Sequence, residues 1–359
     1  MRKFSLLLSL LLLLCSLSKV SAQGGQLEAK PASEDEAAVI GRGADLFDKG
    51  KYDEAIEQFN KVLVKNPDCA QAIYEMANTY YAGGDSKKAM EYVQMGLKYR
   101  SPNLPLFYTL AGGIEDDNKN PEAAIEDYKK AIALAPKFHY AYFNLGITQR
   151  RMGKTAEALD NFKQAVKLNP GHPSTNFQIA DIYRMKNQKI PAFMAYMSYL
   201  YFANDDDKRI PTALEEIRKL TNAETNSSGG TNISLSMDSS EGDFFASELM
   251  MGLNAASGID KAVDSITNTK LSDYEKELRN YEAVIRIISL DAEKDHSQGF
   301  AMQFYGAYFS SMQKSGNTKT FCHVIGRHIN EKETIEWFES HANDQKTFGD
   351  WEKTYFSKK

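Results

Sequence analysis

Apolar residues recur at three- and four-residue spacing along much of the chain, a pattern that predicts amphipathic α-helices. Residues 139–152 and 155–168 show it most clearly, and a break carrying Gly153 separates them. Gly50 and Gly84 stand at similar breaks. A glycine just past a helix suits the left-handed conformation that ends it. The pattern therefore predicts helices joined in pairs.

The same pairing returns about every 34 residues. Alanines, prolines and small residues upstream of each alanine keep this period in three separate registers, which indicates a repeat array. The three sets are Ala55, Ala89, Ala124, Ala158 and Ala192; Pro67, Pro102, Pro136 and Pro170; and Gly43, Ala77, Gly112, Gly146 and Ala180.

Helix packing gives this period a physical reason. Small side chains are needed where two helices approach to about 8–10 Å. A proline cannot continue a helix, so it separates one unit from the next. One helical hairpin cannot bury its own apolar face, so the hairpins must stack. Aromatic residues would fill the seams between units, at Tyr52, Phe59, Tyr80, Tyr128, Phe162, Tyr183 and Tyr196.

Two segments carry the small, aromatic, alanine and proline positions together: GADLFDKGKYDEAIEQFNKVLVKNPD and YFNLGITQRRMGKTAEALDNFKQAVKLNPGHP. They resemble tetratricopeptide repeats. The resemblance implies an all-α fold, a tetratricopeptide-repeat α-solenoid of about five helical hairpins over residues 36–221. Its last part is a capping helix near residues 211–220. The predicted units are 36–69, 70–103, 105–138, 139–172 and 173–206.

Composition changes after the repeats. Residues 222–243 are rich in Ser, Gly, Asn and Thr, which predicts a flexible linker, and the weak alternation at 231–237 allows a short strand. Residues 244–359 form a predicted helical C-terminal domain without the repeat period. Its segments FAMQFYGAYFSSMQKSGNTKTFCHVIG and IEWFESHANDQKTFGDW resemble a C-terminal region that accompanies repeats in uncharacterised exported bacterial proteins. Its expected helices are 244–256, 271–289, 297–314, 318–327, 331–341 and 345–356.

The first 22 residues have the layout of a secretory signal peptide, with Arg2 and Lys3 before an apolar run and small residues before Gln23. We therefore expect an exported, periplasmic or secreted protein without a transmembrane segment in its mature chain. Lipid attachment at Cys15 is disfavoured, because Leu14 stands where a small residue is needed.

The net charge and the number of cysteines argue against two further classes of protein. A formal net charge of −5 and the lack of a basic stripe argue against nucleic-acid binding. Cys69 and Cys322 are too few for a disulfide framework. Two buried free thiols are the expected state, and one long-range bridge is the alternative.

No phosphate-binding loop, nucleophile elbow or zinc-binding helix motif occurs in the sequence. Cys322, His323 and His328 lie close together, but their spacing does not put metal ligands on one face of a helix. We expect a buried cysteine beside exposed histidines. The prediction is therefore no catalytic residue, no metal and no cofactor.

The resemblance implies a concave groove built by the first helix of each repeat. Its expected residues are aromatic, amide and charged, as suits a peptide surface. They are Tyr74, Asn78, Tyr81, Thr109, Asp116, Tyr140, Phe143, Asn144, Ile147, Arg150, Phe177, Asp181 and Arg184. The groove lacks the lysine and arginine clamp that holds a C-terminal carboxylate. Burial of Phe143, Ile147 and Phe177 inside the protein is the alternative.

These observations predict a non-catalytic scaffold of the bacterial cell envelope that binds a protein or peptide partner in the groove. Two alternatives stay open: an enzyme with an active site in the C-terminal domain, and a purely structural subunit of an envelope complex.

Overall fold

The computed structural model describes residues 27–221, 224–225, 231–232, 235, 240–242, 244–257, 271–294 and 299–357. The predicted signal peptide, with Cys15, lies outside these residues. Two compact units, Met1–Met152 and Gly153–Lys359, divide the chain.

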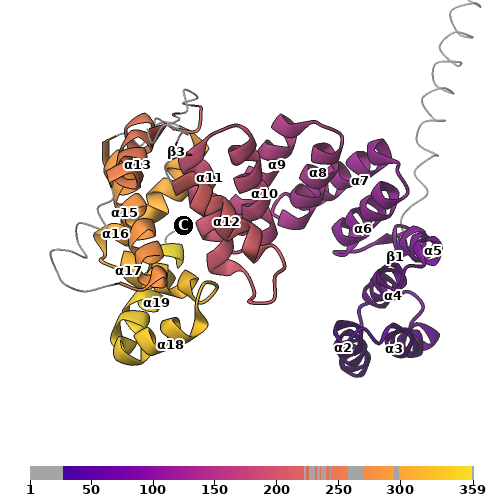
Figure 1. Cartoon of the computed structure of the whole chain (residues 1–359). Helices are drawn as coiled ribbons and strands as arrows, with labels where there is room; N and C mark the ends of the chain where they lie inside the picture. The colour runs from indigo at the N-terminus through magenta and orange to yellow at the C-terminus, as the bar shows by residue number, and fades with distance from the viewer. Residues whose placement is uncertain are drawn as a thin grey trace, which may run out of the picture. The chain divides into compact units, whose positions relative to one another are not determined.

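The first unit is built of antiparallel helical hairpins that pack in chain order, α2 with α3, α4 with α5 and α6 with α7, followed by α8 (Figure 1). This confirms the predicted hairpins. Their bounds are α2 (Glu34–Asp48), α3 (Tyr52–Lys65), α4 (Ala70–Ala82), α5 (Ser86–Gly96), α6 (Leu104–Asp117), α7 (Pro121–Leu134) and α8 (His139–Arg151).

The turn inside each repeat needs one residue in the left-handed region. Gly50, Gly84 and Gly153 have φ values of 70°, 86° and 77°, as the pattern predicts. The same position falls on Lys119 (φ 67°) and Asn187 (φ 57°) in the third and fifth repeats. The turn geometry therefore persists where glycine does not.

The small residues hold the two helices of a hairpin together. A Cβ added at Gly43 would stand 2.4 Å from Phe59 Cε1, and one added at Gly112 would stand 2.6 Å from Tyr128 Cε1. Both rings are almost completely buried. These two aromatic rings therefore pack within a hairpin, and Phe59 also shares a core cluster with Ala72 and Met76 of the next repeat.

A short parallel pairing at the start of the described chain was not predicted. Strand β1 (Leu27–Glu28) pairs with β2 (Tyr99–Arg100), which follows α5. Nearby, Lys30 Nζ lies 2.8 Å from Asp68 Oδ2. The pairing fixes the chain ahead of α2 against the second repeat.

The second unit has α11 at its centre. The helix is apolar on all sides and almost wholly buried, and it contacts α10, α12, α13, α17 and η1. Repeat helices and C-terminal helices therefore share this unit. Their bounds are α9 (Thr155–Leu168), α10 (Pro173–Met185), α11 (Lys189–Phe202), α12 (Ile210–Thr221), α13 (Phe245–Ser257), α15 (Asp273–Lys294), the π-helix η1 (Met302–Gly306), α16 (Ala307–Lys314), α17 (Thr318–Gly326), α18 (Glu331–Ser340) and α19 (Ala342–Ser357).

Within the predicted linker, β3 (Glu224–Thr225) pairs antiparallel with β4 (Thr231–Asn232). Near the linker's end, Glu241 is only 4% exposed. Its carboxylate accepts hydrogen bonds from Lys163 Nζ at 2.5 Å and Tyr183 Oη at 2.9 Å. Composition predicts flexibility here, but a buried ion pair fixes this residue.

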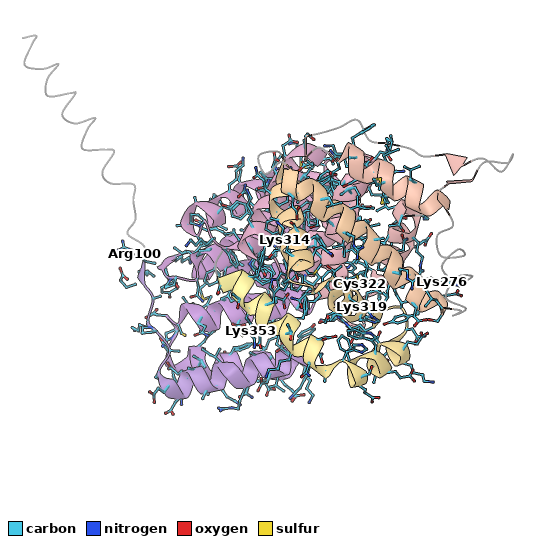
Figure 2. The ribbon with its side chains drawn as sticks, turned by 90° about the vertical axis from the view of Figure 1, so that its left-hand side faces the viewer. Arg100, Lys276, Lys314, Lys319, Cys322 and Lys353 are labelled. Atoms are coloured by element: carbon cyan, nitrogen blue, oxygen red, sulfur yellow. The ribbon has the colours of Figure 1, made fainter. Side chains whose placement is uncertain are left out.

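Both cysteines of the described chain, Cys69 and Cys322, are buried free thiols, as expected. Cys322 lies on α17, one turn from Lys319 (Figure 2). None of the helices in the described ranges has the length and apolar character needed to cross a bilayer.

Candidate functional site

A cavity of about 520 Å³ opens on the first unit, along α4, α6 and α8. These are the first helices of the second, third and fourth repeats. The lining combines aromatic, amide and charged side chains. It consists of Tyr74, Asn78, Tyr81, Leu106, Thr109, Leu110, Gly113, Asp116, Asp117, Tyr128, Phe138, Tyr140, Asn144, Ile147 and Arg151.

Tyrosines form much of the wall. Tyr74 packs edge-on against Phe107 with ring centroids 5.7 Å apart, and burial raises the pKa of its hydroxyl to about 12. Tyr140 is 46% exposed at the rim and packs edge-on against Phe138. Both residues therefore offer apolar ring surface to the cavity, and the Tyr74 hydroxyl stays protonated.

Two carboxylates at the end of α6 organise the polar part of the cavity. Asp116 is only 8% exposed and accepts a hydrogen bond from Thr148 Oγ1 at 2.6 Å. It also accepts a hydrogen bond from the Arg151 guanidinium. Asp117 Oδ2 accepts a hydrogen bond from the Tyr81 hydroxyl at 2.5 Å, and burial together with this bond raises the pKa of Tyr81. Carboxylates of one repeat thus contact side chains of both neighbouring repeats.

The structure brings most of the sequence-predicted residues of this unit together. The cavity contains Tyr74, Asn78, Tyr81, Thr109, Asp116, Tyr140, Asn144 and Ile147. Phe143 and Arg150 lie on α8 outside the lining, and Arg151 lines the cavity instead.

The three predicted residues of the fifth repeat lie in the second unit. The Phe177 ring packs edge-on against Tyr196 and Tyr199, at centroid distances of 5.8 and 5.1 Å. Phe177 is only partly buried among these helices.

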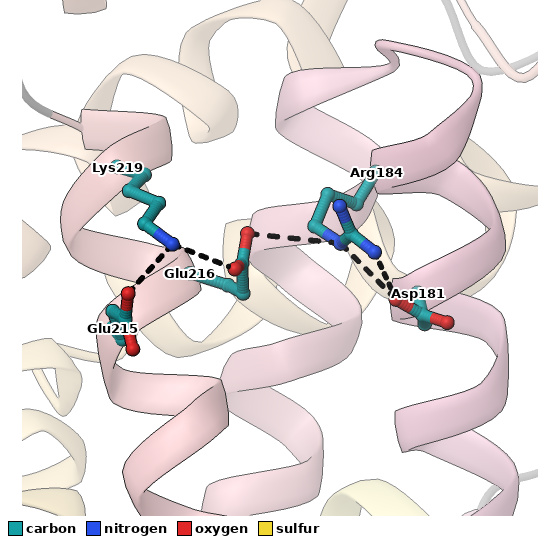
Figure 3. A network of polar contacts seen from close by, with 5 residues as sticks. All are labelled: Asp181, Arg184, Glu215, Glu216 and Lys219. Atoms are coloured by element: carbon teal, nitrogen blue, oxygen red, sulfur yellow. Dashed lines mark hydrogen bonds and ion pairs between the residues drawn. The ribbon is translucent and has the colours of Figure 1, made fainter.

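Asp181 and Arg184 belong to an ion-pair chain that reaches the capping helix α12 (Figure 3). Arg184 Nη2 lies 2.6 Å from Asp181 Oδ1, and its Nε lies 3.6 Å from Glu216 Oε2. Lys219 continues the chain, with Nζ 3.1 Å from Glu216. These two residues therefore stabilise the end of the repeat array.

Several lining residues were not predicted: Leu106, Leu110, Gly113, Asp117, Tyr128, Phe138 and Arg151. Leu106 and Gly113 stand three residues before and four residues after Thr109 on the same helix. Side chains at these spacings share a helix face. That spacing is the signal that would have found them.

The expectation of exposed histidines beside Cys322 is wrong. His323 is only 6% exposed, because its ring stacks on Trp337 at 3.8 Å and its Nδ1 lies 3.0 Å from Tyr274 Oη. Burial lowers the pKa of His323 to about 3. The His328 side chain is only 2% exposed, and its Nε2 lies 2.9 Å from the Leu200 carbonyl oxygen. Stacking on a large aromatic residue, which spacing along the chain does not reveal, accounts for the difference.

Burial also raises the pKa of the Cys322 thiol, which disfavours the reactive thiolate. Across the residues that the structure describes, no group of three or more His, Cys, Asp or Glu side chains is placed to hold a metal ion.

Family comparisons agree with the hairpin geometry. A model described as tetratricopeptide repeat matches residues 139–172, and one described as TPR repeat matches residues 43–84 and 117–153. The chain therefore contains tetratricopeptide repeats within residues 43–84 and 117–172, and further helices follow the repeat array.

Among curated relatives, the chain is 24% identical over 172 residues to the type IV pilus assembly protein PilF of Pseudomonas aeruginosa, covering 46% of this chain and 67% of PilF. It is 29% identical over 133 residues to human tetratricopeptide repeat protein 6, covering 37% of this chain and 25% of that protein. A solved structure of P. aeruginosa PilF aligns with a TM-score of 0.47 and 19% identity, covering 66% of this chain and 94% of that one.

Proposed function

We propose that this chain is a non-catalytic scaffold that binds an extended segment of a protein partner in the cavity along α4, α6 and α8. The observation that carries the proposal is the lining of that cavity, where aromatic walls stand beside amide and carboxylate groups. Large aromatic residues are enriched among the anchors of protein interfaces. Asn78 and Asn144 supply side-chain amides, which can pair with both polar groups of an extended backbone.

We place this activity in the bacterial cell envelope. The leader-like sequence of residues 1–22 supports export, and the similarity to a protein described by its role in type IV pilus assembly supports an envelope setting. Fractionation of cells that express the full chain tests the location. Recovery with the cytosol would contradict it.

Binding is tested with peptides selected from a random display library on the full chain. The double variant Tyr140→Ala/Asn144→Ala removes one ring and one amide from the rim of the cavity. The control is Tyr142→Ala, because Tyr142 lies on the same helix outside the lining and bonds the Pro136 carbonyl oxygen.

We expect the double variant to weaken peptide binding roughly 30-fold, the effect of losing about 2 kcal/mol at an interface anchor. The control should bind within about twofold of the wild type, as surface changes outside an interface usually do. Circular dichroism checks that both variants are folded. Equal affinity of the folded double variant and the wild type would refute the groove assignment.

A further inference from the structure

The second unit contains a cavity of about 510 Å³. Repeat helices α9, α10 and α11 form one part of its lining, and η1, α16 and α19 form the other. Its volume lies within the range of about 300–1,000 Å³ typical of small-molecule sites. The repeats and the C-terminal helices therefore build a site that neither provides alone.

Aromatic side chains form most of its wall. Phe202, Phe304, Tyr308 and Phe356 come from four different elements, and each is only partly buried. The rings of Tyr308 and Phe356 stack with centroids 5.9 Å apart. Partly exposed aromatic rings gathered around a hollow indicate a binding site for an apolar group.

This wall is held in place from behind. Tyr305 is buried and donates a hydrogen bond to Asn176 Oδ1 at 2.8 Å. Asn176 Nδ2 in turn donates to the Pro170 carbonyl oxygen at 2.9 Å. Phe304 and Tyr305 both lie in the π-helix, an irregularity that often occurs at functional sites. The cavity is therefore largely pre-formed.

Charge at the rim is positive. Lys167 lines the cavity, and no aspartate or glutamate of the described chain does so. The Lys167 ammonium lies 5.5 Å from the centroid of the Phe300 ring. One residue of the wall, Tyr308, has an acidic partner: Glu352 accepts hydrogen bonds from Tyr201 at 2.7 Å and Tyr308 at 3.4 Å. Burial raises the pKa of Glu352 above its ordinary value.

From this combination we propose that the cavity binds a single-chain amphiphile with an anionic head group. The apolar chain lies against the rings of Phe202, Phe304, Tyr308 and Phe356, and the head group pairs with Lys167. The aromatic wall suits an apolar chain, and Lys167, the one cation among the described residues of the lining, suits a negatively charged head group.

Dodecanoate and its neutral counterpart dodecan-1-ol are suitable probes, titrated calorimetrically into the full chain below micelle-forming concentrations. Gly171→Leu blocks the cavity, because a Cβ at Gly171 would stand at an ordinary contact distance of 3.6 Å from the Phe202 ring. Lys167→Gln removes the charge. Lys346→Gln is the matched control, since Lys346 is exposed on α19 outside the lining.

We expect one dodecanoate to bind per chain. Gly171→Leu should weaken both probes at least about tenfold, as filling a site does. Lys167→Gln should weaken dodecanoate roughly three- to sixfold, the effect of one solvent-facing ion pair, and leave dodecan-1-ol unchanged. Lys346→Gln should change neither.

Absence of saturable dodecanoate binding to the wild type would overturn the proposal. Unchanged binding by folded Gly171→Leu would also overturn it. If Lys167→Gln affected both probes equally or neither, the head-group assignment would fall. The groove variant Tyr140→Ala/Asn144→Ala should bind dodecanoate normally, and a loss there would move the site to the first unit.

Discussion

Helix α2 contains two glycines, Gly41 and Gly43, that provide an internal test of the packing argument. Both lie in the helix interior, where alanine is favoured over glycine by roughly 0.5–1 kcal/mol. Gly41 is exposed, and no atom lies within 4 Å of a Cβ built there. Gly43 is buried against Phe59. Propensity alone would make the two alanine variants equally stabilising.

Packing predicts opposite effects of the two alanine variants on stability. At position 43 the new Cβ would stand 2.4 Å from Phe59 Cε1, and carbon atoms prefer about 3.5–4.0 Å. The ring is fully buried, so it can move only by displacing the core. Overpacking of this kind costs about 1–3 kcal/mol. After the helix gain, we expect Gly43→Ala to destabilise by about 1 kcal/mol and Gly41→Ala to stabilise by a similar amount.

Urea unfolding followed by circular dichroism, with hydrogen exchange to localise the effect in α2 and α3, measures this difference. Phe59→Leu should relieve part of the Gly43→Ala penalty, because the two side chains share one space and their effects are not additive. If Gly43→Ala and Gly41→Ala raise stability equally, close helix approach is not the reason for the small-residue register.

Lys119, Glu241 and His323 provide three further predictions. Lys119 holds a left-handed backbone conformation that costs a non-glycine residue about 1–2 kcal/mol. Lys119→Gly should therefore stabilise the protein by about 0.5–1 kcal/mol in urea unfolding, and Gly153→Ala at the equivalent turn should destabilise it. Glu241→Ala should destabilise the protein by about 3 kcal/mol, because it leaves Lys163 without its buried partner. Adding Lys163→Met should restore much of this loss. Additive effects of the two substitutions would contradict the pairing. Burial lowers the pKa of His323 from the ordinary value of about 6.5 to about 3 in the folded chain. The free energy of unfolding should therefore fall as the pH drops from about 6.5 toward about 3, and it should fall less steeply in His323→Gln. Parallel pH profiles of the two proteins would exclude His323 as the cause.

The helices and turns of the repeats were predictable because their causes are local. Periodicity, glycine at the turns and the register of small residues each act within one hairpin. The predicted capping helix near 211–220 appears as α12, Ile210–Thr221. Pro121 lies in the first turn of α7, a position that tolerates proline.

What the sequence did not reveal depends on distant contacts. The pairing of Leu27 with Tyr99 and the burial of Glu241 join segments far apart in the chain, and no periodicity marks them. Arg150 and Arg151 are a finer case. Adjacent residues point about 100° apart on a helix, so only one of the two lines the cavity, and contacts with the neighbouring repeats set how α8 is turned about its axis.

Asp116 lies in the floor of the proposed groove and also joins two repeats, through Thr148 and Arg151 on α8. A ligand group that drew Arg151 toward itself would loosen that joint, and one that reinforced the pair would stiffen it. Occupancy of the proposed groove would therefore be coupled to the flexibility between the third and fourth repeats, and a partner bound there would also adjust how easily the array bends.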